Sequence, residues 1–386
     1  MPASVSMFID ASGMIYLAYI YFLKSSKNVI FDDLSKSFSI WLLTLIFWVF
    51  WAYHQLGIEG LVGLREWIRL FSFLLIYLLS KELVRIKGYE YLMNCILLSL
   101  VTPLVVGGYQ IFSKQGRYIA DIHRIYGTLA HPNAFSLYLT LFIGVTIWKL
   151  KFSEKPKFWY GLILILFIEQ IGTFSLGGMV MMVSFLFVFI IGEFEAKGRL
   201  LSFLILAIFS AIFFGLESGQ ERIARLHTMP ALQEIWNREI VTNSFSWRIV
   251  NWKLLFEQWA KNPLLGYGLY TSGLVNPWRG YAAHNDYIRF LIELGTIGIA
   301  IFVWFQFKIA SNLVNKYKYC QNVEQKYLAM LMGGIYFSMI IGSSVDNHIS
   351  YTTFHFYFWA LLACVMHKST EKSGGNGLNM LTQSSP

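Results

Sequence analysis

The sequence predicts an all-α membrane protein, a polytopic bundle of about eleven or twelve transmembrane helices with one large, partly helical loop. Of the 386 residues, 56% are hydrophobic and only 14% are charged, which is more apolar surface than one soluble core buries. Apolar runs of about twenty residues, close to the thickness of a hydrocarbon core, recur along the chain. These runs do not alternate with polar residues, so a transmembrane β-barrel is a poor alternative.

Each apolar run bounded by charged residues defines one expected span. The runs cover residues 5–23, 38–56, 67–83, 92–112, 134–150, 158–174, 179–191, 200–215, 287–307, 327–345 and 353–366. A Gly-containing stretch at residues 173–178 could be either a turn between two spans or a break within one long helix.

These runs divide the chain into four regions. Residues 1–215 should form a first set of transmembrane helices, residues 216–286 a large outer loop, and residues 287–367 a second set of transmembrane helices. Residues 368–386, which are rich in Gly, Ser and Asn, should form a disordered cytoplasmic tail.

Lysine marks the connections that should face the cytoplasm. Lysine-rich segments follow alternate expected spans and the last span, so the positive-inside rule places the N-terminus and residues 216–286 on the outer side. The net charge of +9 therefore reflects topology and does not predict nucleic-acid binding. The three cysteines lie in or beside expected spans and none lies in the large loop, so the sequence does not predict a disulfide framework.

Arginine predominates on the expected outer side. Examples are Arg124, Arg248, Arg279 and Arg289. A guanidinium group binds phosphate or carboxylate bidentately, so this bias suggests a phosphorylated or acidic ligand. Lipid headgroup contacts and loop salt bridges explain any single arginine equally well.

Within the large loop, residues 246–261 predict an amphipathic helix at the membrane interface. Trp252, Leu255 and Phe256 share one helical stripe with Trp259, whereas Arg248 and residues such as Asn251 lie mostly off it. The helix should end at Asn262-Pro263, and the glycines at 266, 268 and 273 allow tight turns after it.

His284 lies just before the helix that follows this loop. Asn285 or Asp286 can cap that helix, so His284 should sit at its outer end, near the positive end of the helix dipole. An anion is favoured there, and the imidazole is biased toward the neutral form that a general base needs. The simpler interpretation is a polar residue satisfied at the interface.

A second polar group precedes the expected span at residues 134–150. Pro132 and Asn133 suit a turn and helix start, and Arg124, His123 and His131 bring polar groups to the same side, so Arg124 and Asn133 are candidate substrate-binding residues. Structural capping is the simpler role for Asn133. Asp346 opens toward the outer face and could line the same cavity, whereas Glu293 should pair with Arg289 four residues earlier. No metal-ligand spacing or nucleotide-binding glycine loop is present.

These motifs, in this order, resemble the O-antigen ligase and O-antigen polymerase superfamily of bacterial envelope glycan assembly. The similar features are GTLAHPN before a mid-chain span, Arg248 and Trp252 followed by NPLLGYG, and HNDYIRFLIELGTIG entering the next span. The resemblance covers roughly residues 127–298.

The resemblance implies a metal-independent, inverting glycosyl transfer at the periplasmic face of the inner membrane, without a cofactor. The implied donor is a glycan on undecaprenyl pyrophosphate, and the acceptor is another lipid-linked glycan or the lipid A-core. Arg248 matches an arginine that engages the pyrophosphate, His284 matches the base, and Asn285 would orient the site. Membrane lipids and a chain-length regulator are further implied partners, and nucleic acid is not.

The sequence departs from the family pattern in two places. Many members carry Ser-Arg at the turn where this chain has Ser175 and Leu176, so Arg124, Arg279 or Arg289 would have to substitute. The start is also one span short of the usual twelve. We expect a repeat-unit polymerase, with the ligase as the alternative. A transporter or flippase would show inverted repeats, which are not evident here.

Overall fold

The computed structural model describes residues 12, 13, 16, 31–119, 122–193, 196–216, 220, 224 and 230–367. The elements before the large loop are α2 (Asp33–Leu56), η1 (Gly57–Leu61), α3 (Val62–Lys87), α4 (Tyr89–Ser99), α5 (Val101–Ser113), β1 (Arg117–Ile119), β2 (Ile122–Arg124), α6 (Pro132–Phe152), α7 (Pro156–Gly172), α8 (Leu176–Gly192) and α9 (Ala196–Gly215). Those within and after it are α11 (Leu232–Arg238), α12 (Ser244–Trp259), α13 (Ser272–Val275), α14 (Asp286–Tyr319), α15 (Val323–Gly342), η2 (His348–Ser350) and α16 (Thr352–Met366). The two short strands pair antiparallel.

The predicted helical membrane class is confirmed. Four stretches of described helix are long and apolar enough to cross a membrane, at Asp33–Lys87, Tyr89–Ser113, Pro132–Phe152 and Asp286–Tyr319. The helices α8 and α16 are apolar but shorter. The total of eleven or twelve spans stays a prediction, and the first expected span and the C-terminal tail lie outside the described residues.

Two expected spans differ in detail from the structure, and one uncertainty is resolved. The run at residues 92–112 lies within the candidate span Tyr89–Ser113, which Leu100 divides into α4 and α5 because Pro103 has no N–H to donate to the preceding turn. The span that starts after the large loop continues as α14 to Tyr319. At residues 173–178 the chain makes a real turn, and the Oγ of Ser175 caps α8 by accepting the N–H of Gly178 at 3.0 Å.

The core of the bundle surrounds α6. This helix is buried on nearly every face and packs against α7, α8 and α15, while α8 also lies along α15. Phe135, Tyr138 and Phe142 of α6 are essentially inaccessible. Because protein covers nearly all of its sides, no single hydrophobic stripe distinguishes one face of α6.

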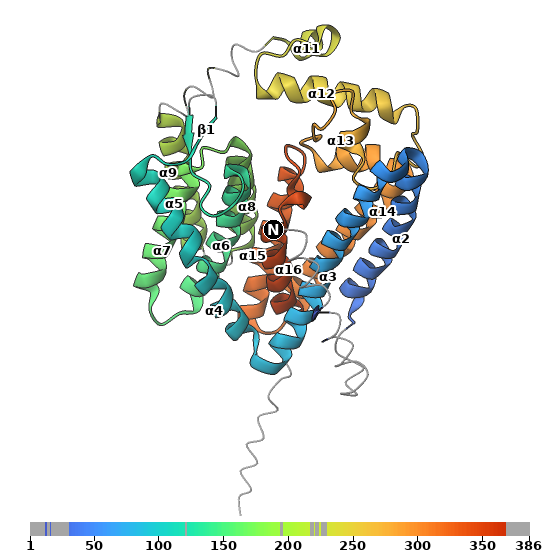
Figure 1. Cartoon of the computed structure of the whole chain (residues 1–386). Coiled ribbons are helices and arrows are strands. Elements are labelled where there is room, and N and C mark those ends of the chain that lie inside the picture. The colour runs from blue at the N-terminus through green and yellow to red at the C-terminus, as the bar shows by residue number, and fades with distance from the viewer. Residues whose placement is uncertain are drawn as a thin grey trace, which may run out of the picture.

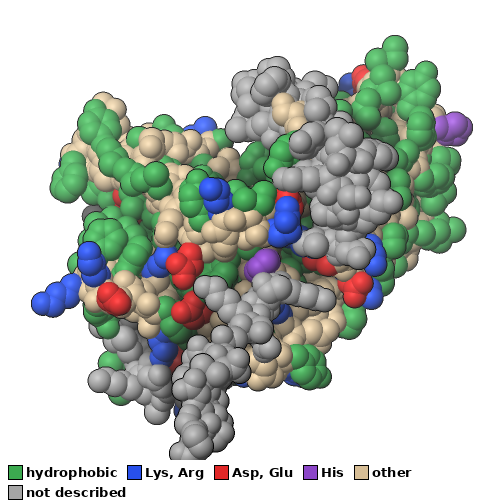
Figure 2. Space-filling view, turned by 90° about the horizontal axis from the view of Figure 1, so that it is seen from below, with side chains coloured by type: hydrophobic (Ala, Val, Ile, Leu, Met, Phe, Trp, Pro, Cys, Tyr) green, Lys and Arg blue, Asp and Glu red, His purple; other side chains and the backbone are tan. Residues whose placement is uncertain are grey.

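The helices run between two ends of the molecule (Figure 1). The starts of α6 and α14 lie at the upper end, where α11 and α12 extend across the bundle, and the connections α6 to α7 and α14 to α15 lie at the lower end. Seen from below, Lys, Arg, Asp and Glu side chains lie among hydrophobic ones (Figure 2). The lysines near the α6 to α7 connection belong to this lower end, so the residues expected to form the site lie at the opposite end from them.

A break in α14 receives the backbone of the segment 263–268. Gly295 has φ +65°, and a Cβ there would lie 2.3 Å from the carbonyl oxygen of Leu264. The freed N–H of Thr296 donates to the Pro263 carbonyl at 2.9 Å, and the N–H of Gly268 donates to the Glu293 carbonyl at 2.7 Å. The NPLLGYG segment therefore docks on α14 through its backbone and fixes the end of α12 against this helix.

Candidate functional site

A cleft of about 500 Å³ opens at the upper end of the bundle. We call it the main cleft, and its polar lining includes Arg124, His131, Asn133, Arg248 and His284. These residues come from β2, the start of α6, the first turns of α12 and the residue pair before α14. The structure thus brings Arg248 and His284, which are far apart in the sequence, to one cleft.

His284 lies in a strained backbone conformation. Its φ of +48° is in the left-handed region, which non-glycine residues rarely adopt. The segment before it is held by α12, because the Nδ2 of Asn251 donates to the Ala282 carbonyl at 3.0 Å and the Nε1 of Trp252 donates to the Ala283 carbonyl at 2.7 Å. Strain of this kind persists only where the surrounding structure imposes it, and it is concentrated at functional sites.

Asp346 fixes the ring of His284. The Nδ1 of His284 lies 3.1 Å from Oδ1 of Asp346, and the side chains are 40% and 8% exposed. A carboxylate accepts from Nδ1–H, so Nε2 is left as the nitrogen that can take up a proton. The arrangement of a buried carboxylate behind a half-exposed imidazole is the one that orients a general base.

Asp346 is held in its charged form. Burial disfavours the charge, but hydrogen bonds from His284, from the Tyr351 hydroxyl and from Nδ2 of Asn133 outweigh it and hold the pKa of Asp346 well below its usual range. The backbone N–H of Asn347 adds another hydrogen bond at 2.9 Å. An ionised Asp346 can therefore stabilise an imidazolium that forms on His284.

Arg248 enters the main cleft without a counterion. Its Nε is buried and has no hydrogen-bond partner, and no carboxylate pairs with its guanidinium within the described ranges. A buried donor of this kind is costly unless something satisfies it. The main cleft is therefore suited to an anionic ligand.

Arg124 lies beside the turn between α7 and α8. Its Nε donates to the Thr173 carbonyl at 2.7 Å, and its Nη2 donates to Oδ1 of Asn133 at 2.8 Å. The Oγ of Ser175 donates to the same Asn133 oxygen at 2.8 Å. Of the three arginines expected to substitute for Leu176, Arg124 is thus the one that the structure places at that turn and in the main cleft.

Asn133 does not have the capping role expected for it. His131 is the residue whose side chain caps α6, through an Nδ1 that accepts the N–H of Asn133 at 3.1 Å. Asn133 instead connects Arg124 to Asp346 through its amide. Burial and the nearby Arg124 lower the pKa of His131 to about 4. A neutral His131 with an accepting Nδ1 carries its proton on Nε2, as a hydrogen-bond donor.

Three expected site residues do not line the main cleft. Asn285 caps α14 by accepting the N–H groups of Tyr287 and Ile288, and its Nδ2 donates to the Ser344 carbonyl. Since these N–H groups are satisfied, the start of α14 is a poorer anion site than expected. Arg279 is exposed and does not line this cleft.

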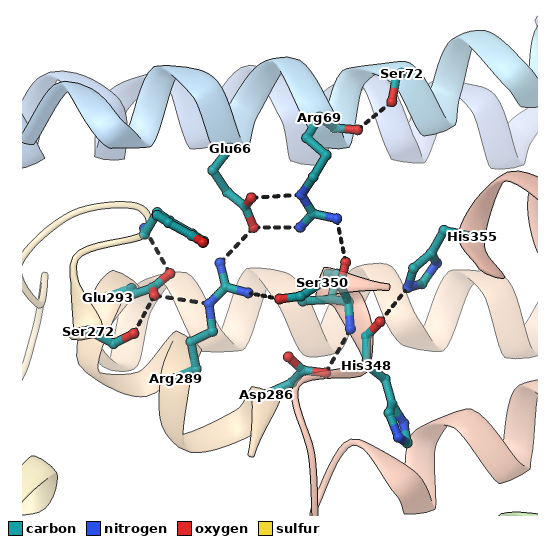
Figure 3. A network of polar contacts seen from close by, with 12 residues as sticks. Glu66, Arg69, Ser72, Ser272, Asp286, Arg289, Glu293, His348, Ser350 and His355 are labelled. Carbon is teal, nitrogen blue, oxygen red and sulfur yellow. Dashed lines mark hydrogen bonds and ion pairs between the residues drawn. The ribbon is translucent and has the colours of Figure 1, made fainter. Parts of the chain in front are cut away.

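Arg289 belongs to a buried ionic network (Figure 3). Its Nη2 lies 2.6 Å from Oε1 of Glu66, and its Nε lies 3.0 Å from Oε1 of Glu293. The predicted pair with Glu293 is confirmed. Arg69, bound to Glu66, also donates from Nη1 to the Ile349 carbonyl at 2.6 Å. This network ties α3 and α14 to the loop that carries Asp346.

The stripe predicted for α12 is covered by protein. Leu255 is fully buried, and Trp252, Phe256 and Trp259 pack with Ala283, Ile288 and Ile292 around the start of α14. Asn251, expected mostly off the stripe, is also buried. The periodicity correctly identified an apolar face, but that face packs against α14 and not against lipid.

Three main contributors were given no catalytic or binding role from the sequence, although Asp346 was expected at the cavity and His131 on the same side. His131 and Trp247 line the main cleft, and Asp346 lies behind His284. The cluster of Asp346, Asn347 and His348 at the outer end of a span was the available signal. Among the described residues, no group of His, Cys, Asp or Glu is placed to hold a metal ion.

Comparison with known proteins agrees with the sequence resemblance. The family model described as O-antigen ligase matches residues 161–303, which include Arg248 and His284 but not Arg124, His131, Asn133 or Asp346. No curated protein matches the chain. Residues 161–303 are therefore similar to the O-antigen ligase family, in agreement with the superfamily that the sequence motifs resemble.

Proposed function

We propose that this protein transfers a glycan from a prenyl pyrophosphate carrier to an acceptor hydroxyl, with His284 as the general base. The observation that carries the proposal is the hydrogen bond between Nδ1 of His284 and the charged Asp346, which leaves Nε2 to accept a proton at the main cleft. The match of residues 161–303 to the O-antigen ligase family model supports a lipid-linked glycan substrate in general.

The unpaired Arg248 supports the pyrophosphate as the anionic part of the donor. A guanidinium fork matches phosphate oxygens, and charge on the leaving pyrophosphate increases as its bond to the sugar breaks. Arg124 also lines the main cleft, and Nε2–H of His131 is a further neutral donor. These groups are suited to stabilising the leaving group without protonating it.

The reaction would proceed by inversion in one displacement. Nε2 of His284 takes the proton of the acceptor hydroxyl, whose oxygen bonds to the anomeric carbon. The bond from that carbon to the pyrophosphate oxygen breaks, and its electron pair leaves with the prenyl pyrophosphate. Asp346 then stabilises the imidazolium. This mechanism needs no metal, which stays a prediction.

The periplasmic side is the expected location of this chemistry. The main cleft lies at the end of the bundle opposite the lysine-bearing connections, and the positive-inside rule assigns those to the cytoplasm. The donor would then arrive within the outer leaflet of the inner membrane.

A repeat-unit polymerase remains the leading assignment, and the description of the matching family as O-antigen ligase favours the ligase as the second candidate. A gel of surface lipopolysaccharide from a deletion strain tests both. A core carrying one repeat indicates a lost polymerase, and a bare core with accumulating lipid-linked polymer indicates a lost ligase.

Complementation of the same strain tests the site. Wild-type protein should restore the normal pattern, whereas Asp346→Asn should not, because an amide no longer selects the Nε2 base form of His284. Full restoration by Asp346→Asn at equal protein level would exclude the proposed base. An unchanged lipopolysaccharide pattern in the deletion strain would exclude both assignments.

A further inference from the structure

A second cleft of about 240 Å³ is lined by residues close in sequence to His284 and Asp346. Its lining includes Tyr270, Gly273, Ala282, Arg289, Asn347 and Ser350. The two clefts share none of their lining residues, but two residues of the second cleft are sequence neighbours of His284 and Asp346. Ala282 precedes His284 by two positions, and Asn347 directly follows Asp346.

We propose that the second cleft binds a sugar residue of the acceptor, a neutral and hydroxyl-rich ligand, while the main cleft binds the donor pyrophosphate. The inference rests on the proposed function for its role in transfer. The donor and the acceptor would then bind in separate clefts, and His284 would act on the acceptor hydroxyl where the two substrates meet.

The charge of the second cleft excludes an anion as the preferred ligand. Its charged lining residue, Arg289, is bound by Glu66 and Glu293, while Glu66 also binds Arg69. Two arginines and two carboxylates leave this network neutral, and the side chain of Arg289 is only 3% exposed. Arg248 in the main cleft has no such carboxylate in the described structure. A phosphate would therefore bind at the main cleft.

The remaining lining matches the two kinds of surface on a sugar ring. Asn347 is about nine-tenths buried, and its Nδ2 has no hydrogen-bond partner among the described residues, since only its Oδ1 and backbone are bound. The ring of Tyr270 is packed on the guanidinium of Arg289 at 5.0 Å and remains partly exposed. An aromatic face accommodates the C–H surface of a sugar, and amide and hydroxyl groups bind its rim.

The size of the second cleft also favours a sugar over a lipid chain. Its volume lies below the range of about 300–1,000 Å³ that is typical of drug-sized ligand sites. One sugar residue fits such a volume, whereas a prenyl chain does not. In this arrangement, the next hydroxyl of the acceptor would reach past Ala282 to Nε2 of His284 and lose its proton there.

Filling the second cleft tests the proposal. Gly273 has no strained φ, and an added Cβ would be 3.8 Å from the Tyr281 carbonyl oxygen and 3.9 Å from Gly280, so Gly273→Leu narrows the cleft without a backbone clash. The matched control is Gly161→Leu on α7, where a Cβ meets nothing within 4 Å. Tyr270→Ala removes the aromatic face instead of filling the cleft.

The assay uses a prenyl pyrophosphate oligosaccharide extracted from the native host as donor. The acceptor probe is the same oligosaccharide without pyrophosphate, carried as an octyl glycoside. Gly273→Leu and Tyr270→Ala should raise the acceptor KM about tenfold or more, with the donor KM unchanged. Gly161→Leu should behave as wild type. An unchanged acceptor KM in both cleft variants, at normal protein level, would overturn the proposal, as would a rise confined to the donor KM.

A binding measurement separates this inference from the proposed function. Saturation-transfer NMR of the octyl glycoside with donor-free protein should show binding to wild type and its loss in Gly273→Leu. Failure of wild type to make any product, with this binding pattern intact, would overturn the transferase and leave the sugar site. Equal binding to wild type and Gly273→Leu, or none to either, would overturn the sugar site itself.

Discussion

Arg248 and Arg289 lie on neighbouring parts of the upper end but in opposite states. Arg289 is bound by two carboxylates and a serine hydroxyl and is almost inaccessible. Arg248 lines a cleft with a buried Nε that has no partner in the described residues. An arginine whose donors are bound by protein groups holds secondary-structure elements together. An arginine with an unsatisfied donor beside a strained histidine is suited to binding a ligand. The difference separates the scaffold from the candidate site.

The largest expected change is in the transfer rate of the His284→Ala variant, which tests the candidate site. Loss of a general base should lower the transfer rate by about a hundredfold to ten-thousandfold, with no loss of protein from the membrane. Transfer of labelled glycan in isolated membranes measures the rate. The control is His54→Ala, an exposed histidine at the end of α2. A rate near wild type would remove His284 as the base.

The next largest expected change is a loss of stability in the Arg289→Met variant, which tests the scaffold. Removing this cation leaves Glu293 buried without its ion-pair partner, which should cost about 3–5 kcal/mol of folding free energy. The melting temperature of the purified protein should fall sharply. Arg279→Met, at an exposed position, should leave it nearly unchanged. Equal melting temperatures for both variants would mean that the network contributes little to the scaffold.

Unlike Arg289→Met, Arg248→Lys should lower activity and leave stability unchanged. A point charge cannot reproduce the guanidinium fork, so we expect kcat/KM for the donor to fall about ten- to a hundredfold with the melting temperature unchanged. Arg238→Lys on α11, where the arginine is exposed and paired with Glu234, is the matched control. An unaffected rate would place the donor phosphate elsewhere.

The smallest effect concerns pH. The pKa of His131 falls from 6.5 to about 4 on folding, so between these values the unfolded chain binds a proton that the folded protein does not. This contribution makes stability fall as the pH is lowered through that window. His131→Asn keeps a side-chain acceptor for the cap but does not titrate. Its melting temperature should therefore decline less between pH 6.5 and 4.

The remaining slope in that experiment has a known source. Burial also lowers the pKa of His348, which contributes with the same sign. Arg117, Arg124, Asp346 and His284 are the charged or titratable groups around His131, and none is altered by the substitution. An identical decline in the two proteins would show that His131 does not titrate as described.

The sequence by itself determined the class of this protein and most of its helices. Apolar runs bounded by charge located α2, α3, α6, α8, α15 and α16 within a few residues, because burial in lipid needs only length and apolarity, which are local properties. It also identified the pair of Arg289 and Glu293, since a spacing of four residues brings side chains together on any helix.

Only the tertiary structure decided which polar groups meet. Asn285, Arg279 and Arg289 were expected at the ligand site alongside Arg124 and Asn133. The sequence indicated a cap role for Asn285 and an ion pair for Arg289, but it did not show which of the five residues line one cleft. The separation depends on how the segment 263–268 docks at the break in α14 and how the buried network holds the loop after α15. Those contacts join residues far apart in the chain, so no periodicity or spacing encodes them. They alone place Asp346 behind His284 and leave Arg248 without a counterion in the described structure.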